Sequence, residues 1–223
     1  MPDVFASWSG GKDCCQAVYR AQQSGFKVRY LLNMVTQDGR RSCSHGIAAK
    51  WIKLQSEAME IPLLQKPTTG DNYEAVFIDS LAKLKQEGVE TGIFGDIDVM
   101  PHLEWIQNAG RRAGVTPVLP LWQQDQHKLA AGFIDLGFTA IIVAVRADLP
   151  GEEWLGRKFD HAFLRDVAAL QKDISPCGEA GEFHSLVVDG PLFKKRIEIQ
   201  EAVKVQRENH WFLDIRQCAL VEK

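Results

Sequence analysis

Short apolar runs alternate with amphipathic stretches along the first half of the chain. Residues 28–35 (VRYLLNMV) form a nearly continuous apolar run, which is typical of a strand buried on both faces. Shorter runs predict further strands at residues 3–7, 61–65, 91–96 and 116–119. The stretches between them predict helices at about residues 12–24, 47–59, 73–87 and 102–113. Strands that alternate with helices indicate an α/β fold with a parallel sheet.

The pattern changes at about residue 125. Helices are predicted at residues 125–136 and 161–170, with an apolar strand at 138–145 between them. After Glu182 the pattern predicts strands only, at residues 183–190, 192–200, 202–208 and 210–216. We therefore predict two domains, an α/β domain at residues 1–125 and a smaller α+β domain at residues 126–223 that ends in antiparallel strands.

Composition places the chain among globular proteins, with 45% hydrophobic and 25% charged residues. A net charge of −3 and a pI of about 6.1 give no sign of a strongly basic surface, so nucleic acid is not an expected partner. No apolar run reaches the roughly 18 residues of a membrane span, and the first residues lack a signal-peptide pattern. Five cysteines without a CxxC spacing fit a reducing compartment. We expect a cytoplasmic protein with no membrane partner.

The first predicted strand runs into the segment SWSGGKDC, residues 7–14, which then opens a helix. It is not a Walker loop, because that motif has Ser or Thr after the lysine and Asp13 follows Lys12 here. Glycines still let the backbone approach an anion, and a helix N-terminus offers N–H groups and a positive dipole end. Asp13 would repel a phosphate, so it indicates either a Mg²⁺ ion between the two or a helix cap.

This segment resembles the SGGxDS signature of the PP-loop ATP pyrophosphatases, which cleave ATP between the α and β phosphates. Ser9, Gly10, Gly11 and Asp13 match it, and Cys14 stands where that family usually has Ser. Three further motifs follow in order, GDI at residues 95–97, PLW at 120–122 and CGEAGEFHS at 177–185. Together the four motifs resemble the diphthine–ammonia ligase family, whose namesake makes diphthamide on elongation factor 2.

The resemblance implies an adenine-nucleotide alpha-hydrolase-like (HUP) fold, a parallel sheet with helices on both faces. It also implies a ligase in which ATP adenylates a carboxylate, pyrophosphate leaves, and ammonia displaces AMP to form an amide. ATP, Mg²⁺, ammonia and a carboxylate acceptor are then expected, with Asp13 as the metal-binding residue. The residues expected to bind ATP are Ser7, Ser9, Gly10, Gly11, Lys12, Asp13, Cys14, Met34, His45, Gly46, Gly95 and Asp96.

The late motif supplies the other candidates for catalysis. Glu179 and Glu182 lie three residues apart in a glycine-rich stretch, where they are expected to bind ammonia or the acceptor or to deprotonate ammonium. His184 replaces an acid of the eukaryotic-like enzymes, and it fits a general base, a substrate hydrogen-bond donor or an ordinary strand residue. With Lys12 and Asp13, these three form the predicted catalytic set.

Several alternatives stay open at this point. The change at His184 resembles a prokaryotic branch, so the acceptor is diphthine, a cobalamin precursor or another acid. Two other functions compete with the ligase, a PP-loop enzyme that acts on tRNA and a non-catalytic adenine-nucleotide-binding protein. The sequence also leaves open the source of ammonia and the oligomeric state, including a homodimer. Trp105 is predicted to pack in the core rather than to line a pocket.

Overall fold

The computed structural model describes residues 1–149, 151–170, 172 and 174–223. Two compact units divide the chain. The first comprises Met1–Ser9 and Asp13–Gln123, and the second comprises Gly10–Lys12 and Gln124–Lys223. The middle of the glycine-rich segment therefore packs as part of the second unit, although its neighbours in the sequence belong to the first.

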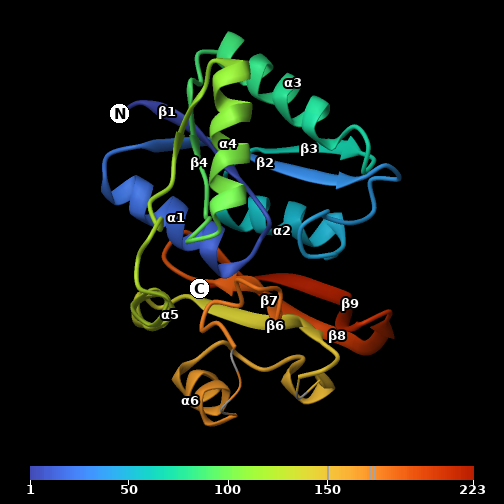
Figure 1. Cartoon of the computed structure of the whole chain (residues 1–223). Coiled ribbons are helices and arrows are strands. Elements are labelled where there is room, and N and C mark those ends of the chain that lie inside the picture. The colour runs from blue at the N-terminus through green and yellow to red at the C-terminus, as the bar shows by residue number, and fades with distance from the viewer. Residues whose placement is uncertain (150, 171, 173) are drawn as a thin grey trace. The chain divides into compact units, whose positions relative to one another are not determined.

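The first unit is built on a sheet of five parallel strands (Figure 1). In chain order they are β1 (Asp3–Ser7), β2 (Lys27–Thr36), β3 (Leu63–Thr68), β4 (Thr91–Ile93) and β5 (Thr116–Val118). Their order across the sheet is β3-β2-β1-β4-β5, so the direction of winding reverses between β1 and β4. In sheets of this kind, ligands bind at the carboxyl ends of the strands beside such a switch.

The connections between these strands contain α1 (Lys12–Gln23), α2 (Ala49–Met59), α3 (Tyr73–Gln86) and α4 (Met100–Ala113). Helices α1 and α2 cover one face of the sheet, and α3 and α4 cover the other (Figure 1). Successive strand residues face opposite layers. Phe5 of β1 shares a buried cluster with Phe77 of α3 and Ile106 of α4, whereas the Trp8 indole donates a hydrogen bond to the Gln55 side chain of α2 at 3.1 Å.

The second unit is built on four antiparallel strands in the order β7-β6-β9-β8. They are β6 (Thr139–Arg146), β7 (Phe183–Asp189), β8 (Lys195–Arg207) and β9 (His210–Glu222). Its helices are α5 (Gln126–Asp135), the 3₁₀ helix η1 (Gly151–Trp154) and α6 (His161–Ala169). One face of the sheet packs on an aromatic core, in which the Phe183 ring lies 5.2–6.2 Å from the rings of Trp154, Phe159 and Phe163.

The predicted α/β class and the antiparallel C-terminal strands are confirmed. The prediction of two strands at residues 192–200 and 202–208 is wrong, because β8 runs unbroken through both. A register shift near Glu201 shows the reason, since a bulge there adds a residue without turning the chain.

Other boundaries differ by a few residues. Strand β3 continues through Pro67 because it is an edge strand, where a missing N–H is tolerated. Strand β4 ends at Ile93 rather than at residue 96. Asn72 precedes α3, and its side chain makes no capping hydrogen bond. Trp105 packs as predicted, with its ring 5.0 Å from that of Phe77.

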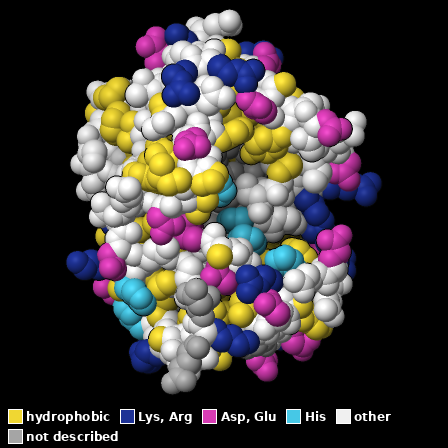
Figure 2. Space-filling model, in the orientation of Figure 1, with side chains coloured by type: hydrophobic (Ala, Val, Ile, Leu, Met, Phe, Trp, Pro, Cys, Tyr) yellow, Lys and Arg dark blue, Asp and Glu magenta, His cyan; other side chains and the backbone are white. Residues whose placement is uncertain are grey.

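Acidic and basic side chains are interspersed over the face of the molecule drawn in Figure 2. This distribution agrees with the small net charge of the chain. Among the helices of the described residues, none is long and apolar enough to cross a membrane.

Candidate functional site

The glycine-rich segment leaves the carboxyl end of β1 and enters α1, at the switch in strand order. Ser7 is the last residue of β1. The Ser9 hydroxyl donates a hydrogen bond to the Cys14 sulfur at 3.5 Å. Asp13 lies in the first turn of α1, where a negative charge interacts favourably with the helix dipole. Asp13 thus has a structural reason to be acidic as well as the predicted role in binding metal.

The two adjacent cysteines are not placed for thiol chemistry. Cys14 is 6% exposed and Cys15 is fully buried. Burial raises the pKa of the Cys15 thiol well above its ordinary value, and the hydrogen bond to Cys14 and the charge of Asp13 act in the same direction. A thiol that stays protonated is a poor nucleophile. All five cysteines lie in the described part of the chain, and none is in a disulfide.

The loop after β4 meets the start of α1 at Gly95 and Asp96. A Cβ on Gly95 would lie 2.8 Å from the Cys14 nitrogen and 2.9 Å from the Asp13 carbonyl carbon, so only glycine fits there. The Asp96 carboxylate lies 3.2 Å from His102 Nδ1. Burial raises the pKa of Asp96, and the negative charge of Asp13 adds to this rise, whereas His102 opposes it. The structure therefore brings Asp13 and Asp96 together.

Three further predicted ATP-binding residues, Met34, His45 and Gly46, lie on β2 or in the loop after it. Met34 is 4% exposed, and its carbonyl accepts a hydrogen bond from the Cys43 N–H at 2.9 Å. His45 is half-buried in the loop beyond. The carbonyl of Gly46 accepts a hydrogen bond from the Arg41 guanidinium at 2.8 Å. His45 and Gly46 thus lie in a second loop at the carboxyl edge of the sheet, whose strands β1 and β2 are neighbours.

The same loop borders a cavity of about 920 Å³. Its lining residues are Thr36, Gln37, Asp38, Gly39, Arg40, Arg41, Ala48 and Lys50. Three of these side chains are cationic and one is acidic, so the cavity suits an anion better than a cation.

The middle of the glycine-rich segment lies along β7 in the second unit. The Val187 N–H donates to the Gly10 carbonyl at 3.0 Å, and the Lys12 N–H donates to the Ser185 hydroxyl at 3.2 Å. The Lys12 side chain is buried, with 5% exposure of the residue, and its ammonium donates to the Cys177 carbonyl. The ammonium of Lys12, which was predicted to bind ATP, is thus bound by the late motif in this structure.

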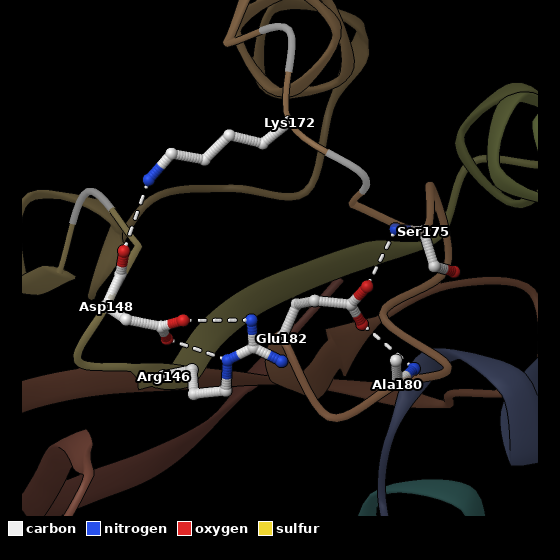
Figure 3. A network of polar contacts seen from close by, with 6 residues as sticks. All are labelled: Arg146, Asp148, Lys172, Ser175, Ala180 and Glu182. Carbon is white, nitrogen blue, oxygen red and sulfur yellow. Dashed lines mark hydrogen bonds and ion pairs between the residues drawn. The ribbon is translucent and has the colours of Figure 1, made fainter.

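Glu182 holds the loop of the late motif in shape (Figure 3). The residue is 2% exposed. Its two carboxylate oxygens accept hydrogen bonds from the backbone N–H groups of Ser175 at 2.8 Å and Ala180 at 2.9 Å. Gly178 lies in the same loop with φ at +73°, and a Cβ there would lie 2.6 Å from the Phe183 carbonyl oxygen. This geometry favours a positioning role for Glu182 over a base that faces substrate.

Ser175 joins the parts of this loop, and sequence analysis did not single it out. Its hydroxyl accepts hydrogen bonds from the N–H groups of Cys177 at 3.2 Å and Glu179 at 3.1 Å, and it donates to the Gln126 side chain. Glu179 is half-buried beside it. Serine before a glycine-rich turn is a known turn signal, because its hydroxyl can bond the N–H two residues ahead.

Arg146 was likewise not among the site residues predicted from the sequence. Its Nε and Nη2 atoms donate to the Asp148 carboxylate at 2.7 and 3.0 Å (Figure 3). The Lys172 ammonium donates to the Asp148 carbonyl at 3.2 Å. The hydrogen bonds that Arg146 donates to Asp148 raise the pKa of Arg146, and the negative charges of Asp148 and Glu182 add to the rise. An arginine that ends an apolar strand was the available signal in the sequence.

His184 lies on β7, opposite Ala144 of β6. Burial lowers the pKa of His184 to about 4, and the positive charges of Lys12 and His210 act in the same direction. The ring is therefore neutral at pH 7 and is a weak base. Of the predicted roles, this environment favours a hydrogen bond to substrate over removal of a proton from ammonium.

No group of three or more His, Cys, Asp and Glu side chains is placed to hold a metal among the described residues. Asp13 and Asp96 nevertheless fit Mg²⁺, which typically binds one or two carboxylates together with substrate phosphates and several waters. The charge of Asp13 contributes to the raised pKa of Asp96, and a cation would relieve this repulsion.

The strand order of the first unit, with a glycine-rich turn at its switch point, defines a doubly wound α/β protein. The chain belongs to the diphthamide synthase family. The family model described as the diphthamide synthase N-terminal domain matches residues 3–117, and that of the C-terminal domain matches residues 125–221. The family predicted from the four motifs is confirmed.

Curated relatives named diphthine–ammonia ligase are similar over nearly the whole chain. The Schizosaccharomyces pombe protein is 29% identical, with 96% of this chain and 39% of that protein covered. The Bos taurus protein is 27% identical, with 98% and 91% covered. The predicted class, an amide-forming ligase, agrees with these names.

One solved structure is described as a predicted subunit of tRNA methyltransferase from Methanocaldococcus jannaschii. It aligns with a TM-score of 0.45 at 13% identity and covers 86% of this chain and 98% of that one.

Proposed function

We propose that this protein is an ATP-dependent, AMP-forming ligase that joins ammonia to a carboxylate, with diphthine as the first acceptor to test. The observation that carries the proposal is the pairing of Asp13 and Asp96 beside the glycine-rich turn. Two carboxylates at the carboxyl ends of neighbouring parallel strands suit a nucleotide bound with Mg²⁺. The family names supply the choice of acceptor and of ammonia.

The reaction has two balanced steps. A carboxylate oxygen of the acceptor attacks the α-phosphorus of ATP, the bond to the β-phosphate breaks, and pyrophosphate leaves. Ammonia then attacks the acyl carbon, AMP leaves, and one proton is lost. Both leaving groups are anions, so the protein contributes chiefly by positioning the reactants and neutralising charge. Mg²⁺ would supply positive charge, held by Asp13 and Asp96.

We assign ATP binding to the domain at residues 1–125 and acceptor binding to the domain at residues 126–223. The centre of the proposed ATP site is formed by Ser9, Asp13, Cys14, Gly95 and Asp96, which the structure groups around the start of α1. Of the other predicted ATP-binding residues, Ser7 on β1, Met34 on β2, and His45 and Gly46 in the loop after β2 would lie around this centre.

The acceptor domain would work through the late motif. Glu182 would fix the loop through its two backbone hydrogen bonds, and the loop would present Glu179. His184 would contribute a hydrogen bond rather than a proton transfer, because its pKa is about 4.

The test is an assay of AMP and pyrophosphate. The full chain is incubated with ATP, Mg²⁺, ammonium and elongation factor 2 that carries diphthine, and the amide is detected by mass spectrometry. We expect equal amounts of AMP, pyrophosphate and amide, with AMP release that depends on acceptor and ammonium. A protein that binds ATP but releases no AMP with this or any other carboxylic acid would be a nucleotide-binding protein instead.

A matched pair of variants controls this assay. Asp13→Asn is expected to abolish AMP release because it removes the proposed metal ligand. Asp79→Asn removes a carboxylate of the same domain that is 60% exposed and paired with Lys83, so it should leave the activity intact. Equal activity of both variants would remove Asp13 from the proposed mechanism.

A further inference from the structure

The register of the C-terminal sheet brings charged residues from four segments into one row. In antiparallel pairs, directly opposite side chains lie on the same face, about 4.5–5.5 Å apart at Cβ. Arg146 of β6 lies opposite His210 of β9, which in turn lies opposite Arg207 of β8. On the other side, the Arg146 N–H donates to the Glu182 carbonyl at 3.0 Å.

A second row of residues on the same face includes aromatic and imidazole side chains. Ala144 lies opposite His184 on one side and Phe212 on the other. The His210 and Phe212 ring centroids are 6.0 Å apart, and the Arg207 guanidinium lies 5.9 Å from the Phe212 ring. We call this surface the imidazole–arginine face and define it by Arg146, His184, Arg207, His210 and Phe212.

The opposite face of the same strands serves the core. Val145 and Phe183 point to that side because strand residues alternate, and the Phe183 ring packs 5.2 Å from that of Phe163. The imidazole–arginine face is therefore not part of the aromatic core of this unit. The Arg146 side chain keeps 32% of its surface exposed, so a solute can reach it.

Arg146 is held in a fixed orientation. Asp148 binds two of its three guanidinium nitrogens, Nε and Nη2, and the third points away from Asp148 (Figure 3). A guanidinium is a planar fork of donors that matches a carboxylate. Because the Asp148 contact already restrains the side chain, a ligand that binds the rest of the guanidinium has less rotamer entropy to remove.

The residues that define this face include two arginines, Arg146 and Arg207, and no acid. The pKa of His184 is lowered chiefly by burial, and the positive charge of Lys12 acts in the same direction. Glu182 lies nearby, but its carboxylate oxygens are engaged by the N–H groups of Ser175 and Ala180. Rings beside the cation suit an organic acid better than inorganic phosphate, because the phenyl and imidazole surfaces can pack against carbon atoms.

We propose that Arg146 binds the carboxylate of the acceptor acid on the imidazole–arginine face, with Asp148 as its positioning residue. The His184 and Phe212 rings pack against the organic part of the acid. This inference rests on the proposed function, since the acceptor is the acid that the ligase activates, and it names a residue outside the late motif for that task.

Steady-state kinetics tests the inference with diphthine-bearing elongation factor 2 as the acceptor. Arg146→Lys keeps the charge but loses the fork, and it is expected to raise KM for the acceptor by about 10-fold or more with KM for ATP unchanged. Asp148→Asn should have a smaller effect in the same direction. The matched control is Arg157→Lys, because Arg157 is 33% exposed and pairs with Asp166 at 2.6 Å. An unchanged acceptor KM in Arg146→Lys, or an equal rise in Arg157→Lys, overturns the inference.

A second measurement does not need activity. The ¹⁵Nε signals of the arginine side chains are followed by NMR while butyrate is added as the carboxylate probe, and the Arg146 signal is assigned from Arg146→Lys. We expect the Arg146 signal to move along a saturable curve while that of Arg157 stays in place. If both signals move alike or neither moves, Arg146 is not a carboxylate site. If the Arg146 signal moves but no amide forms, the proposed function fails and the binding site stands.

Discussion

A methyl group on Gly95 would lie 2.8 Å from the backbone nitrogen of Cys14. The loop after β4 thus packs directly against the first turn of α1, with no room for a side chain between them. This contact fixes the distance between the first turn of α1, which carries Asp13, and the loop that carries Asp96. The glycine of the GDI motif is therefore a packing requirement of the proposed ATP site.

Gly95→Ala is expected to lower the free energy of unfolding by about 1–3 kcal/mol, because the atoms that must move belong to the backbone of α1. It should also reduce AMP release. Gly70→Ala is the control, since a Cβ on Gly70 meets nothing within 4 Å, and a change within about 0.5 kcal/mol is expected there. Urea-induced unfolding measures both, and equal stabilities would contradict the proposed contact.

Cys14→Ser is expected to keep AMP release at or above the level of the unchanged protein. A hydroxyl is a better hydrogen-bond partner than a thiol for the Ser9 hydroxyl, which now lies 3.5 Å from the sulfur. The assay compares initial rates at saturating ATP. A sharp loss of turnover would mean that the thiol has a role of its own and is not a passive replacement of serine.

The order of strands and helices in the first unit could be predicted because local patterns determine it. The apolar run at residues 28–35 marks a buried parallel strand, and β2 forms there. The β8 strand was predicted as two, because a bulge at Glu201 interrupts the alternation of side chains much as a turn does. Only the pairing with β9 distinguishes these two cases.

The candidate site could likewise be predicted from the sequence only in part. Asp13 and Asp96 could be placed together from the sequence, because parallel strands end at one edge of a sheet. Arg146 and His210 could not, because they become neighbours through an antiparallel register between β6 and β9. No short motif encodes such a register. The position of the Lys12 ammonium against the Cys177 carbonyl likewise depends on residues that lie far apart in the chain.

Asp96→Asn is expected to raise the stability of the protein at pH 7 while it reduces AMP release. Burial raises the pKa of Asp96, so the folded state holds the charged carboxylate less favourably than the unfolded state does. The gain should shrink as the pH falls through the carboxyl pKa, because the unchanged protein then folds with a neutral group. Urea unfolding at pH 7 and pH 4 measures this, and a less stable variant at pH 7 would contradict it.

Glu182→Gln is expected to cost about 1–3 kcal/mol of stability, because one side-chain oxygen becomes an NH₂ group that cannot accept a backbone N–H. The amide protons of Ser175 or Ala180 should exchange faster in the variant. Glu198→Gln is the control, with a side chain 52% exposed on β8, and little change is expected there. Unchanged exchange at both amides would show that Glu182 does not hold the loop.

His184 gives the protein a stability that depends on pH. The pKa of its ring is about 4 in the folded protein and about 6.5 in an unfolded chain. Between these two pH values the unfolded chain binds more protons than the folded protein. The contribution of the neutral His184 ring to the free energy of unfolding is therefore fully present above pH 6.5 and falls as the pH drops toward 4. The free energy of unfolding that is lost over this pH range is on the order of 3 kcal/mol. His184→Gln should flatten this part of the pH profile of urea unfolding, and NMR should show the folded ring still neutral at pH 5. A His184 ring that titrates near pH 6.5 in the folded protein would contradict the desolvated site on which its proposed role depends.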